Sequence, residues 1–317
     1  MTTRNKRTLM RVLITGGAGF IGANLAARAL VENIDVTVID NFATGSKTNL
    51  LGLDVTVVEA SILDAGALDE ALVGVDSVVH LAALPSVPRS IDDPMASHAA
   101  NATGTLTVLE RARAAGVGHV SVASSSSVYG MNPALPKSER EWVRPMSPYA
   151  VSKLATEQYA LAYQDSFGMR TTAFRFFNVY GPGQTSGHAY AAVVPAFVEA
   201  LIAGRPLHVY GDGMQSRDFT YVGTVCRVLL ETAVRRLSHP EPVNLAFGTN
   251  TTLIHLIEIL ASASGRTAVV EHGPPRAGDV KHSQADNHVL RGLFPEVDPI
   301  PLEQGIAETV AWFESAR

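Results

Sequence analysis

Cysteine is almost missing from this chain of 317 residues, and charged residues make up only 17% of it. The single Cys226 excludes a disulfide within the chain, which is typical of the reducing cytoplasm. The net charge of -5 gives no basic excess with which to neutralise nucleic-acid phosphates. No apolar run approaches the length needed to cross a bilayer. We therefore expect a cytoplasmic protein that binds neither nucleic acid nor a membrane, and we identify no metal site.

Hydrophobic residues, by contrast, are plentiful at 46%. Short runs rich in β-branched residues are separated by segments long enough for crossover helices, which is the pattern of a buried parallel sheet. The sequence therefore predicts an α/β fold with a doubly wound parallel sheet of the Rossmann type. The expected strands are 11–16, 35–40, 54–60, 77–83, 119–125 and 170–178, and the clearest helices are 20–32, 94–115 and 147–168.

The composition changes after about residue 178. Loops rich in proline and glycine are separated there by helical stretches at 190–204, 222–236 and 252–264. Such loops are suited to ligand binding. We expect residues 1–177 to form the Rossmann domain that carries the catalytic residues. Residues 178–317 mainly form a smaller, C-terminal substrate-binding lobe, and some of this segment can return to the Rossmann sheet.

A glycine-rich turn follows the first expected strand. Gly16, Gly19 and Gly22 are spaced three residues apart in TGGAGFIG, directly before an apolar helix. Such glycines let the backbone approach a pyrophosphate, whose charge the helix N-terminus stabilises. The next strand ends in Asp40 and Asn41, about 20 residues downstream, where an acid binds the adenine ribose and repels a 2′-phosphate. The alternative is a tight turn that binds no ligand and an Asp40 that is merely solvated, but this does not explain the spacing between the glycines and Asp40. Because the acid repels a 2′-phosphate, we expect NAD rather than NADP.

A tyrosine and a lysine lie on one face at the start of the expected helix 147–168. Tyr149 and Lys153 are four residues apart, so their side chains project one turn from each other. A nearby ammonium lowers the pKa of a phenol, whose ordinary value of about 10 is too high for a base at neutral pH. Serines 124–127 follow the strand 119–125, at the edge where doubly wound folds bind ligands. These residues fit a catalytic site in which one serine orients a substrate hydroxyl. The alternatives are that Tyr149 and Lys153 are an ordinary pair on a helix surface and that the serines form a polar loop.

Several motifs occur in order along nearly the whole chain: TGGAGFIG, HLAA, SSSSVYG, SPYAVSK, RFFNVYGPGQ, YGDGMQSRDFTYV and PPRAGDVKHSQAD. Together they resemble the extended short-chain dehydrogenase/reductase family and, within it, UDP-hexose 4-epimerases, with sugar-nucleotide dehydratases as cousins. The similarity is greatest to UDP-N-acetylglucosamine 4-epimerases. The resemblance implies that Ser125 is the catalytic hydroxyl residue, Tyr149 the base and Lys153 its partner, whereas His80 is structural.

The resemblance also assigns residues to the cofactor. It implies that NAD is bound by Gly16, Gly19, Phe20, Ile21, Gly22, Asp40, Asn41, Thr44, Ser61, Ile62, Leu81, Ala82, Ala83, Asn101, Tyr149, Lys153 and Phe176. A homodimer is implied as well, in which the helices 94–115 and 147–168 form the interface.

A UDP-sugar is the substrate that the resemblance implies. The family's diphosphate-binding arginines correspond to Arg217 and Arg276, its uridine-ribose acid to Asp279, and the residue near the base to Tyr210. Ser283 is small where some epimerases have a tyrosine, which leaves room for an N-acetyl group at C2 of the sugar. The full set of implied substrate contacts is Ser86, Ser125, Ser126, Asn178, Gln184, Val193, His208, Tyr210, Arg217, Arg276, Asp279 and Ser283.

The implied reaction is a 4-epimerisation of UDP-N-acetylglucosamine or UDP-glucose. Tyr149 removes the 4-OH proton while NAD takes the C4 hydride, and the resulting keto sugar rotates and is reduced on its other face. A UDP-N-acetylhexosamine dehydratase is one alternative, although Ser126 and Ser127 stand where 4,6-dehydratases carry Asp-Glu. A UDP-uronic acid 4-epimerase is another, which needs a cation near C6 such as His188 or Arg89. A catalytically silent NAD-binding regulator lies outside these classes, and the intact catalytic residues argue against it.

Overall fold

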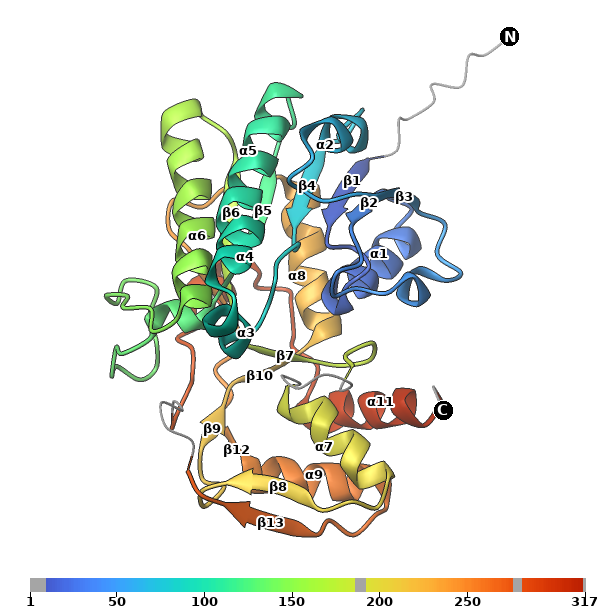
Figure 1. Cartoon of the computed structure of the whole chain (residues 1–317), viewed down its shortest axis with the longest axis vertical. Helices are drawn as coiled ribbons and strands as arrows, with labels where there is room; N and C mark the ends of the chain where they lie inside the picture. Colours follow the sequence, from blue (N-terminus) through green and yellow to red (C-terminus); the bar gives the residue numbers. More distant parts are fainter. Residues whose placement is uncertain (1–9, 186–191, 276–280, 316–317) are drawn as a thin grey trace.

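Seven parallel strands form the centre of the larger part of the molecule (Figure 1). The computed structural model describes residues 10–185, 192–275 and 281–315. The strands pair in the order β11-β6-β5-β4-β1-β2-β3, and every pairing is parallel. Their bounds are β1 Arg11–Thr15, β2 Asp35–Asp40, β3 Thr56–Glu59, β4 Ser77–His80, β5 Val120–Ser125, β6 Thr171–Phe176 and β11 Val243–Leu245.

The strand order reverses direction at β1. Its last residue, Thr15, lies beside Ile39 of β2 on one side and beside His80 of β4 on the other. Because parallel strands all point the same way, the carboxyl ends of β1, β2, β4, β5 and β6 meet at one edge of the sheet. This switch point is where open α/β sheets bind their ligands.

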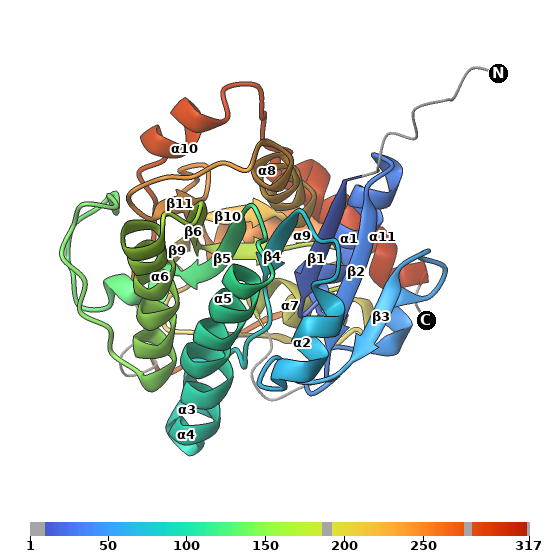
Figure 2. The ribbon, with the colours of Figure 1, turned by 90° about the horizontal axis from the view of Figure 1, so that it is seen from above.

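Helices cover both faces of this sheet (Figure 2). The helices on one face are α1 (Phe20–Val31), α8 (Val222–Arg235) and α10 (His288–Leu293). The helices on the other face are α2 (Ala65–Ala71), α5 (Gly104–Ala114) and α6 (Pro148–Phe167). Each set encloses its own apolar core with the strands, and the burial of these faces is the main stabilising term of the fold. The predicted doubly wound α/β fold is confirmed.

A smaller lobe lies beyond the carboxyl edge of the sheet (Figure 1). Its core is formed by buried apolar residues of its three helices around a parallel pair of strands. The helices are α7 (Val193–Ile202), α9 (Leu253–Ser264) and α11 (Leu302–Ser315), and the paired strands are β8 (Leu207–Tyr210) and β13 (Val270–Gly273). Two further short pairs connect it to the sheet: β7 (Asn178–Tyr180) with β10 (Phe219–Tyr221), and β9 (Ser216–Arg217) with β12 (Thr251–Thr252).

The second half of the chain also contributes to the large sheet. Strand β11 pairs with β6, and α8 packs against α1 beneath β1 and β4. The expected strands and long helices form within a few residues of their predicted bounds, whereas β11 is only three residues long and was not predicted. No helix in the described ranges is long and apolar enough to cross a membrane.

The expected helix 94–115 is present but contains an irregular turn. It consists of α4 (Pro94–His98), a π-helical turn η2 (Ala99–Thr103) and α5. Such wide turns insert one extra residue into a helix and are frequent near functional sites. The remaining short elements are α3 (Val87–Asp92), η1 (Lys47–Leu50) and η3 (Ser126–Tyr129).

Leu229→Ala in α8 is expected to lower the free energy of unfolding by about 2–5 kcal/mol, because the leucine is buried in a closely packed core. Urea denaturation followed by circular dichroism measures this change. Val234→Ala on the same helix is the control, since Val234 is 49% exposed, and it should change the stability by less than about 0.5 kcal/mol. Equal stabilities for the two variants would contradict the assignment of α8 to the core.

Candidate active site

A cavity of about 960 Å³ opens at the carboxyl edge of the sheet. Its walls come from the turn after β1, the ends of β2, β4, β5 and β6, and the first turns of α6. Most of the predicted site residues line it. They are Gly16, Gly19, Phe20, Ile21, Gly22, Asp40, Asn41, Thr44, Ser61, Ile62, Leu81, Ala82, Ala83, Ser86, Ser125, Tyr149, Lys153, Phe176 and Gln184.

The glycine-rich turn forms a tight cradle at one end of this cavity. Gly16 has a φ of +69°, and a Cβ on it would lie 2.7 Å from the backbone of Ala82. A Cβ on Gly22 would lie 2.4 Å from the carbonyl oxygen of Gly16. Helix α1 begins directly after Gly19 without a side-chain cap, so its first N–H groups face the cavity. A space that only glycines leave open, in front of a helix N-terminus, fits the pyrophosphate of a dinucleotide.

Asp40 is held rigidly at the same end. One of its carboxylate oxygens accepts the backbone N–H of Ala18 at 3.0 Å, and the other accepts that of Phe42 at 2.8 Å. The side chain is buried and lines the cavity. Each oxygen keeps a second lone pair for a ribose hydroxyl, whereas a phosphate would meet an uncompensated negative charge. This arrangement fits NAD and disfavours NADP.

Tyr149 and Lys153 lie at the other end of the cavity. Helix α6 is started by Ser147, whose hydroxyl accepts the N–H of Ala150, so Tyr149 is in the first turn. The buried Lys153 ammonium donates to the carbonyl oxygen of Ala123 at 2.9 Å. Burial lowers the pKa of Lys153 to about 8. Burial raises the pKa of the Tyr149 phenol, and hydrogen bonding with Ser125 opposes that rise.

Ser125 ends β5 and caps the turn that follows it. Its hydroxyl oxygen accepts the backbone N–H of Ser127 at 3.2 Å and the hydroxyl of Ser127 at 2.9 Å. Ser125 therefore has a fixed orientation beside Tyr149. The neighbouring Ser126 does not line the cavity, so the two serines are not equivalent.

Asn101, predicted to contact the cofactor, does not line the cavity either. It lies buried in the π-helical turn. Its side-chain oxygen accepts the backbone N–H of Leu84, and its side-chain nitrogen donates to the carbonyl oxygen of Leu84 and to the hydroxyl of Ser152. Asn101 thus ties the cavity loop after β4 to helix α6. The periodicity of the sequence alone does not reveal this π-helical turn, in which Asn101 faces the loop.

The predicted substrate residues are not all found at the cavity. Ser86 lines the cavity with a φ of +98°, a strained conformation that is typical of functional sites. Gln184 also lines it, and among the described residues its buried Oε1 has no hydrogen-bond partner. Other predicted residues belong to the smaller lobe or its connection and do not line this cavity: Asn178, Val193, His208, Tyr210, Arg217 and Ser283. Arg276, Asp279 and the alternative cation His188 lie outside the described residues.

His80 lies behind the cavity in a buried chain of hydroxyl groups. Its two ring nitrogens are 2.7 Å from the Thr15 hydroxyl and 3.0 Å from the Thr105 hydroxyl. Burial, and to a smaller extent the charge of Lys153, lowers the pKa of His80 to about 3. Both ring nitrogens of this buried histidine are engaged with hydroxyl groups, and the side chain does not line the cavity.

Glu157 and Arg175, which lie beside the site, were not singled out from the sequence, and Ser124 was considered only within the serine run 124–127. Ser124 lines the cavity, and its hydroxyl contacts both Lys153 and Glu157. Glu157 forms a buried ion pair with Arg175 of β6. One signal was available in the sequence, because Glu157 follows Lys153 by four residues and therefore shares its helix face.

Gly22→Ala is expected to weaken NAD binding by at least about tenfold, since the added methyl group displaces the Gly16 carbonyl and closes the cradle. Isothermal titration with NAD measures the loss. Gly292→Ala in α10 is a matched control, because a Cβ there meets no atom within 4 Å. Wild-type affinity in the Gly22 variant would contradict the cofactor assignment.

Acidification is expected to destabilise the protein through His80. The unfolded chain takes up a proton near the ordinary pKa of 6.5, whereas the folded protein excludes it down to about 3, so stability falls as pH decreases through this window. The contribution is about 1.4 kcal/mol per pH unit. Urea unfolding from about pH 7 to about pH 5 should show a smaller slope for His80→Gln than for the wild type. Equal slopes would show that His80 has the same pKa in the folded and the unfolded protein, which contradicts the lowered value.

Comparison with known proteins agrees with this geometry. Residues 12–246 match the NAD dependent epimerase/dehydratase family. The chain is 38% identical over 314 residues to the UDP-glucose 4-epimerase of Mycolicibacterium smegmatis, covering 96% of this chain and 99% of that protein.

Solved structures show the same architecture. One is the UDP-N-acetylglucosamine 4-epimerase from Methanobrevibacter ruminantium in complex with UDP-N-acetylmuramic acid, with a TM-score of 0.92, 36% identity and coverage of 98% of this chain and 99% of that one. Another is the Thermus thermophilus UDP-glucose 4-epimerase complex with NAD, with a TM-score of 0.86, 34% identity and coverage of 97% and 100%. The chain therefore belongs to the NAD-dependent epimerase/dehydratase family, as an NAD-dependent enzyme of nucleotide-sugar metabolism.

Proposed function

We propose that this protein is a 4-epimerase of UDP-N-acetylglucosamine that also accepts UDP-glucose. The observation that carries the proposal is the convergence of Ser125, Tyr149 and Lys153 on one end of a cavity whose other end holds the glycine cradle and Asp40. Such a cavity has room for a dinucleotide at one end and for a sugar beside a proton-accepting group at the other, which supports the proposal. Similarity to both a UDP-N-acetylglucosamine 4-epimerase and a UDP-glucose 4-epimerase supports the two substrates.

Each catalytic side chain has a distinct task. Tyr149 accepts the proton of the sugar 4-hydroxyl and later returns it, while Ser125 holds the same oxygen by a hydrogen bond. The Lys153 ammonium stabilises the phenolate form of Tyr149. Bound NAD would supply reversible hydride transfer at C4, so the overall reaction would involve no net oxidation. Inversion then requires only that the opposite face of the sugar is presented before the hydride returns.

Epimerisation is favoured over elimination by the groups in the cavity. Loss of water from the sugar needs an acid and a base besides Tyr149, and 4,6-dehydratases are expected to carry Asp-Glu where this chain has Ser126 and Ser127. Ser126 does not line the cavity, and the hydroxyl of Ser127 is donated to Ser125. Among the described residues that line the cavity, Asp40 is the only carboxylate, and its oxygens are held at the cofactor end.

A UDP-uronic acid 4-epimerase is the second candidate. Arg89 of α3 lines the cavity, and within the described ranges Lys153 is the only other cation that does so. A guanidinium suits the carboxylate of a uronic acid better than an uncharged hydroxymethyl group. Arg89 is therefore the residue whose effect on substrate choice separates the two candidates.

Incubation of the NAD-loaded protein with UDP-N-acetylglucosamine, UDP-glucose and UDP-glucuronic acid in separate reactions tests the proposal. Chromatography with mass spectrometry should show a new isomer of unchanged mass from the first two sugars. Loss of water would instead indicate a dehydratase, and turnover of UDP-glucuronic acid alone would favour the second candidate. Absence of any hydride exchange into the cofactor with all three sugars would overturn both candidates and point to another nucleotide sugar as the substrate.

Tyr149→Phe is expected to lower kcat by about 10²–10⁴-fold, because the phenol oxygen that accepts the proton is removed. Steady-state rates with the preferred sugar measure the loss. Tyr159→Phe is the matched control on the same helix, since Tyr159 is 37% exposed and does not line the cavity. Full turnover in the Tyr149 variant would refute its assignment as the base.

A further inference from the structure

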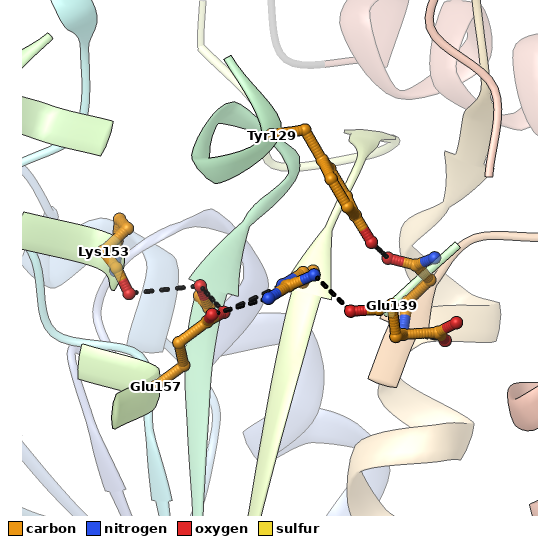
Figure 3. Close-up of polar contacts among 7 residues, drawn as sticks. Tyr129, Glu139, Lys153 and Glu157 are labelled. Carbon is orange, nitrogen blue, oxygen red and sulfur yellow. Dashed lines mark hydrogen bonds and ion pairs between the residues drawn. The ribbon is translucent and has the colours of Figure 1, made fainter. Parts of the chain in front are cut away.

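A buried ion pair connects α6, which carries Tyr149 and Lys153, with β6, the strand that pairs with β5 and its last residue Ser125 (Figure 3). Arg175 of β6 donates from Nε to one carboxylate oxygen of Glu157 at 3.0 Å and from Nη2 to the other at 2.7 Å. The side chains are 4% and 0% exposed, respectively. Two parallel hydrogen bonds from a planar guanidinium fix direction as well as distance. The pair therefore defines how α6 lies against β6.

Glu157 also reaches the strand that ends in Ser125. The Ser124 hydroxyl lies 2.8 Å from the Glu157 carboxylate and 3.1 Å from the carbonyl oxygen of Lys153 (Figure 3). Ser124 and Arg175 are direct partners in the β5–β6 register, so both side chains face α6. Glu157 thus holds the two strands together one turn beyond Lys153.

Arg175 extends the same network to the turn after Ser125. Its guanidinium lies over the ring of Tyr129 at 4.7 Å, and its Nη1 donates to the carbonyl oxygen of Glu139 at 3.3 Å. Tyr129 ends the short helix η3 that Ser125 caps, and its hydroxyl donates to Asn244 at 2.7 Å. Ser125 is therefore bracketed by two neighbours, Ser124 and Tyr129, which are each held by one member of the ion pair.

We propose that Glu157 and Arg175 are positioning residues that set the separation of Ser125 from Tyr149 and Lys153, with Ser124 as the link to β5. The assignment rests on the proposed C4 oxidation, in which both hydroxyl groups must contact one sugar oxygen. Neither charged side chain lines the cavity, so their effect on the reaction passes through the residues they hold. A displacement of about 1 Å at such a site lowers the rate by about 10²-fold.

A purely stabilising role does not require charged residues at these positions. Well-packed apolar side chains often replace a buried ion pair without loss of stability, because they avoid the desolvation of two charges. What they lack is directional hydrogen bonding, and in this network the bonds converge on the residues beside Ser125 and Lys153. The geometry of the pair is thus better suited to fixing positions than to increasing stability.

Two substitutions test the proposal in the full-length, NAD-loaded protein. Ser124→Ala removes the link while leaving the ion pair intact, and Glu157→Asp keeps the charge but shortens its reach by one methylene. Both are expected to lower kcat by about tenfold or more while KM for the UDP-sugar stays within about twofold, as for loss of a transition-state interaction. Ser121→Ala is the matched control, since Ser121 is equally buried on β5 but its hydroxyl faces Val78, away from the cavity. It should retain wild-type kcat.

A second measurement does not depend on turnover. Ultraviolet difference titration follows the ionisation of tyrosine phenols, and the transition that is missing in Tyr149→Phe is assigned to Tyr149. Ser125 and Lys153 are the groups expected to control the pH at which Tyr149 ionises. In Ser124→Ala this transition should move to higher pH, because the hydrogen bond from Ser125 that favours the ionised phenol is weakened.

The outcomes separate the proposal from its alternatives. Wild-type kcat and an unshifted phenol transition in Ser124→Ala would overturn it. A loss of activity in proportion to the unfolded fraction would also overturn the proposal, because it would indicate a role in stability alone. A raised KM at constant kcat would overturn it as well, because it would indicate a role in substrate binding. If Glu157→Asp fails to fold, Ser124→Ala decides alone. If the wild type acts on none of the UDP-sugars, the proposed function fails, whereas the phenol titration still tests the positioning.

Discussion

The parallel pairing of β1 with β2 on one side and β4 on the other is the constraint on which the rest of the site depends. It brings Thr15, Ile39 and His80 into one row, so the turn after β1 lies between the loops after β2 and β4. The glycine cradle faces Asp40 for this reason, and its close approach to Ala82 follows from it. Extension of the same register to β5 and β6 places Ser125 beside Phe176 at the same edge. A shift of one residue in any pairing would turn these side chains to the opposite face.

Burial at this edge shifts the pKa values of Lys153 and Tyr149, the two ionisable groups of the proposed catalytic set, in opposite directions. It lowers the pKa of Lys153 to about 8 and raises that of Tyr149, because each shift favours the uncharged form. The protein's own groups therefore keep Tyr149 protonated near neutral pH. A further positive charge in the cavity, such as that of oxidised NAD, would lower the phenol pKa and favour release of this proton. In the proposed function, the basicity of Tyr149 would then depend on whether the oxidised cofactor is bound.

The sequence predicted well the features that depend on short segments of chain. The first six strands of the large sheet, the start of α6 at Pro148 and the glycine turn each follow from residues that are close together in the sequence. The family, the enzyme class and NAD were predicted correctly, and the roles of individual site residues remain proposals. Features that depend on the register of distant segments were missed. Strand β11 is too short to be recognised without β6 as its partner, and Arg175 looks like any strand residue until β6 lies beside Glu157.

The buried network also explains how the smaller lobe is held relative to the catalytic residues. Asn244 of β11 accepts the hydroxyl of Tyr129, and its own amide donates to the carbonyl oxygens of Lys137 and Asp286. Backbone bonds between Lys137 and residues 284 and 286 add to this link. Ser283, which the family resemblance assigns to the sugar's C2 substituent, lies directly before this attachment. The contacts that orient Ser125 from one side thus continue into the segment that bounds the proposed sugar site. A substitution in the network is for this reason expected to act on both lobes, in contrast to one in the glycine cradle, whose contacts remain within the large sheet.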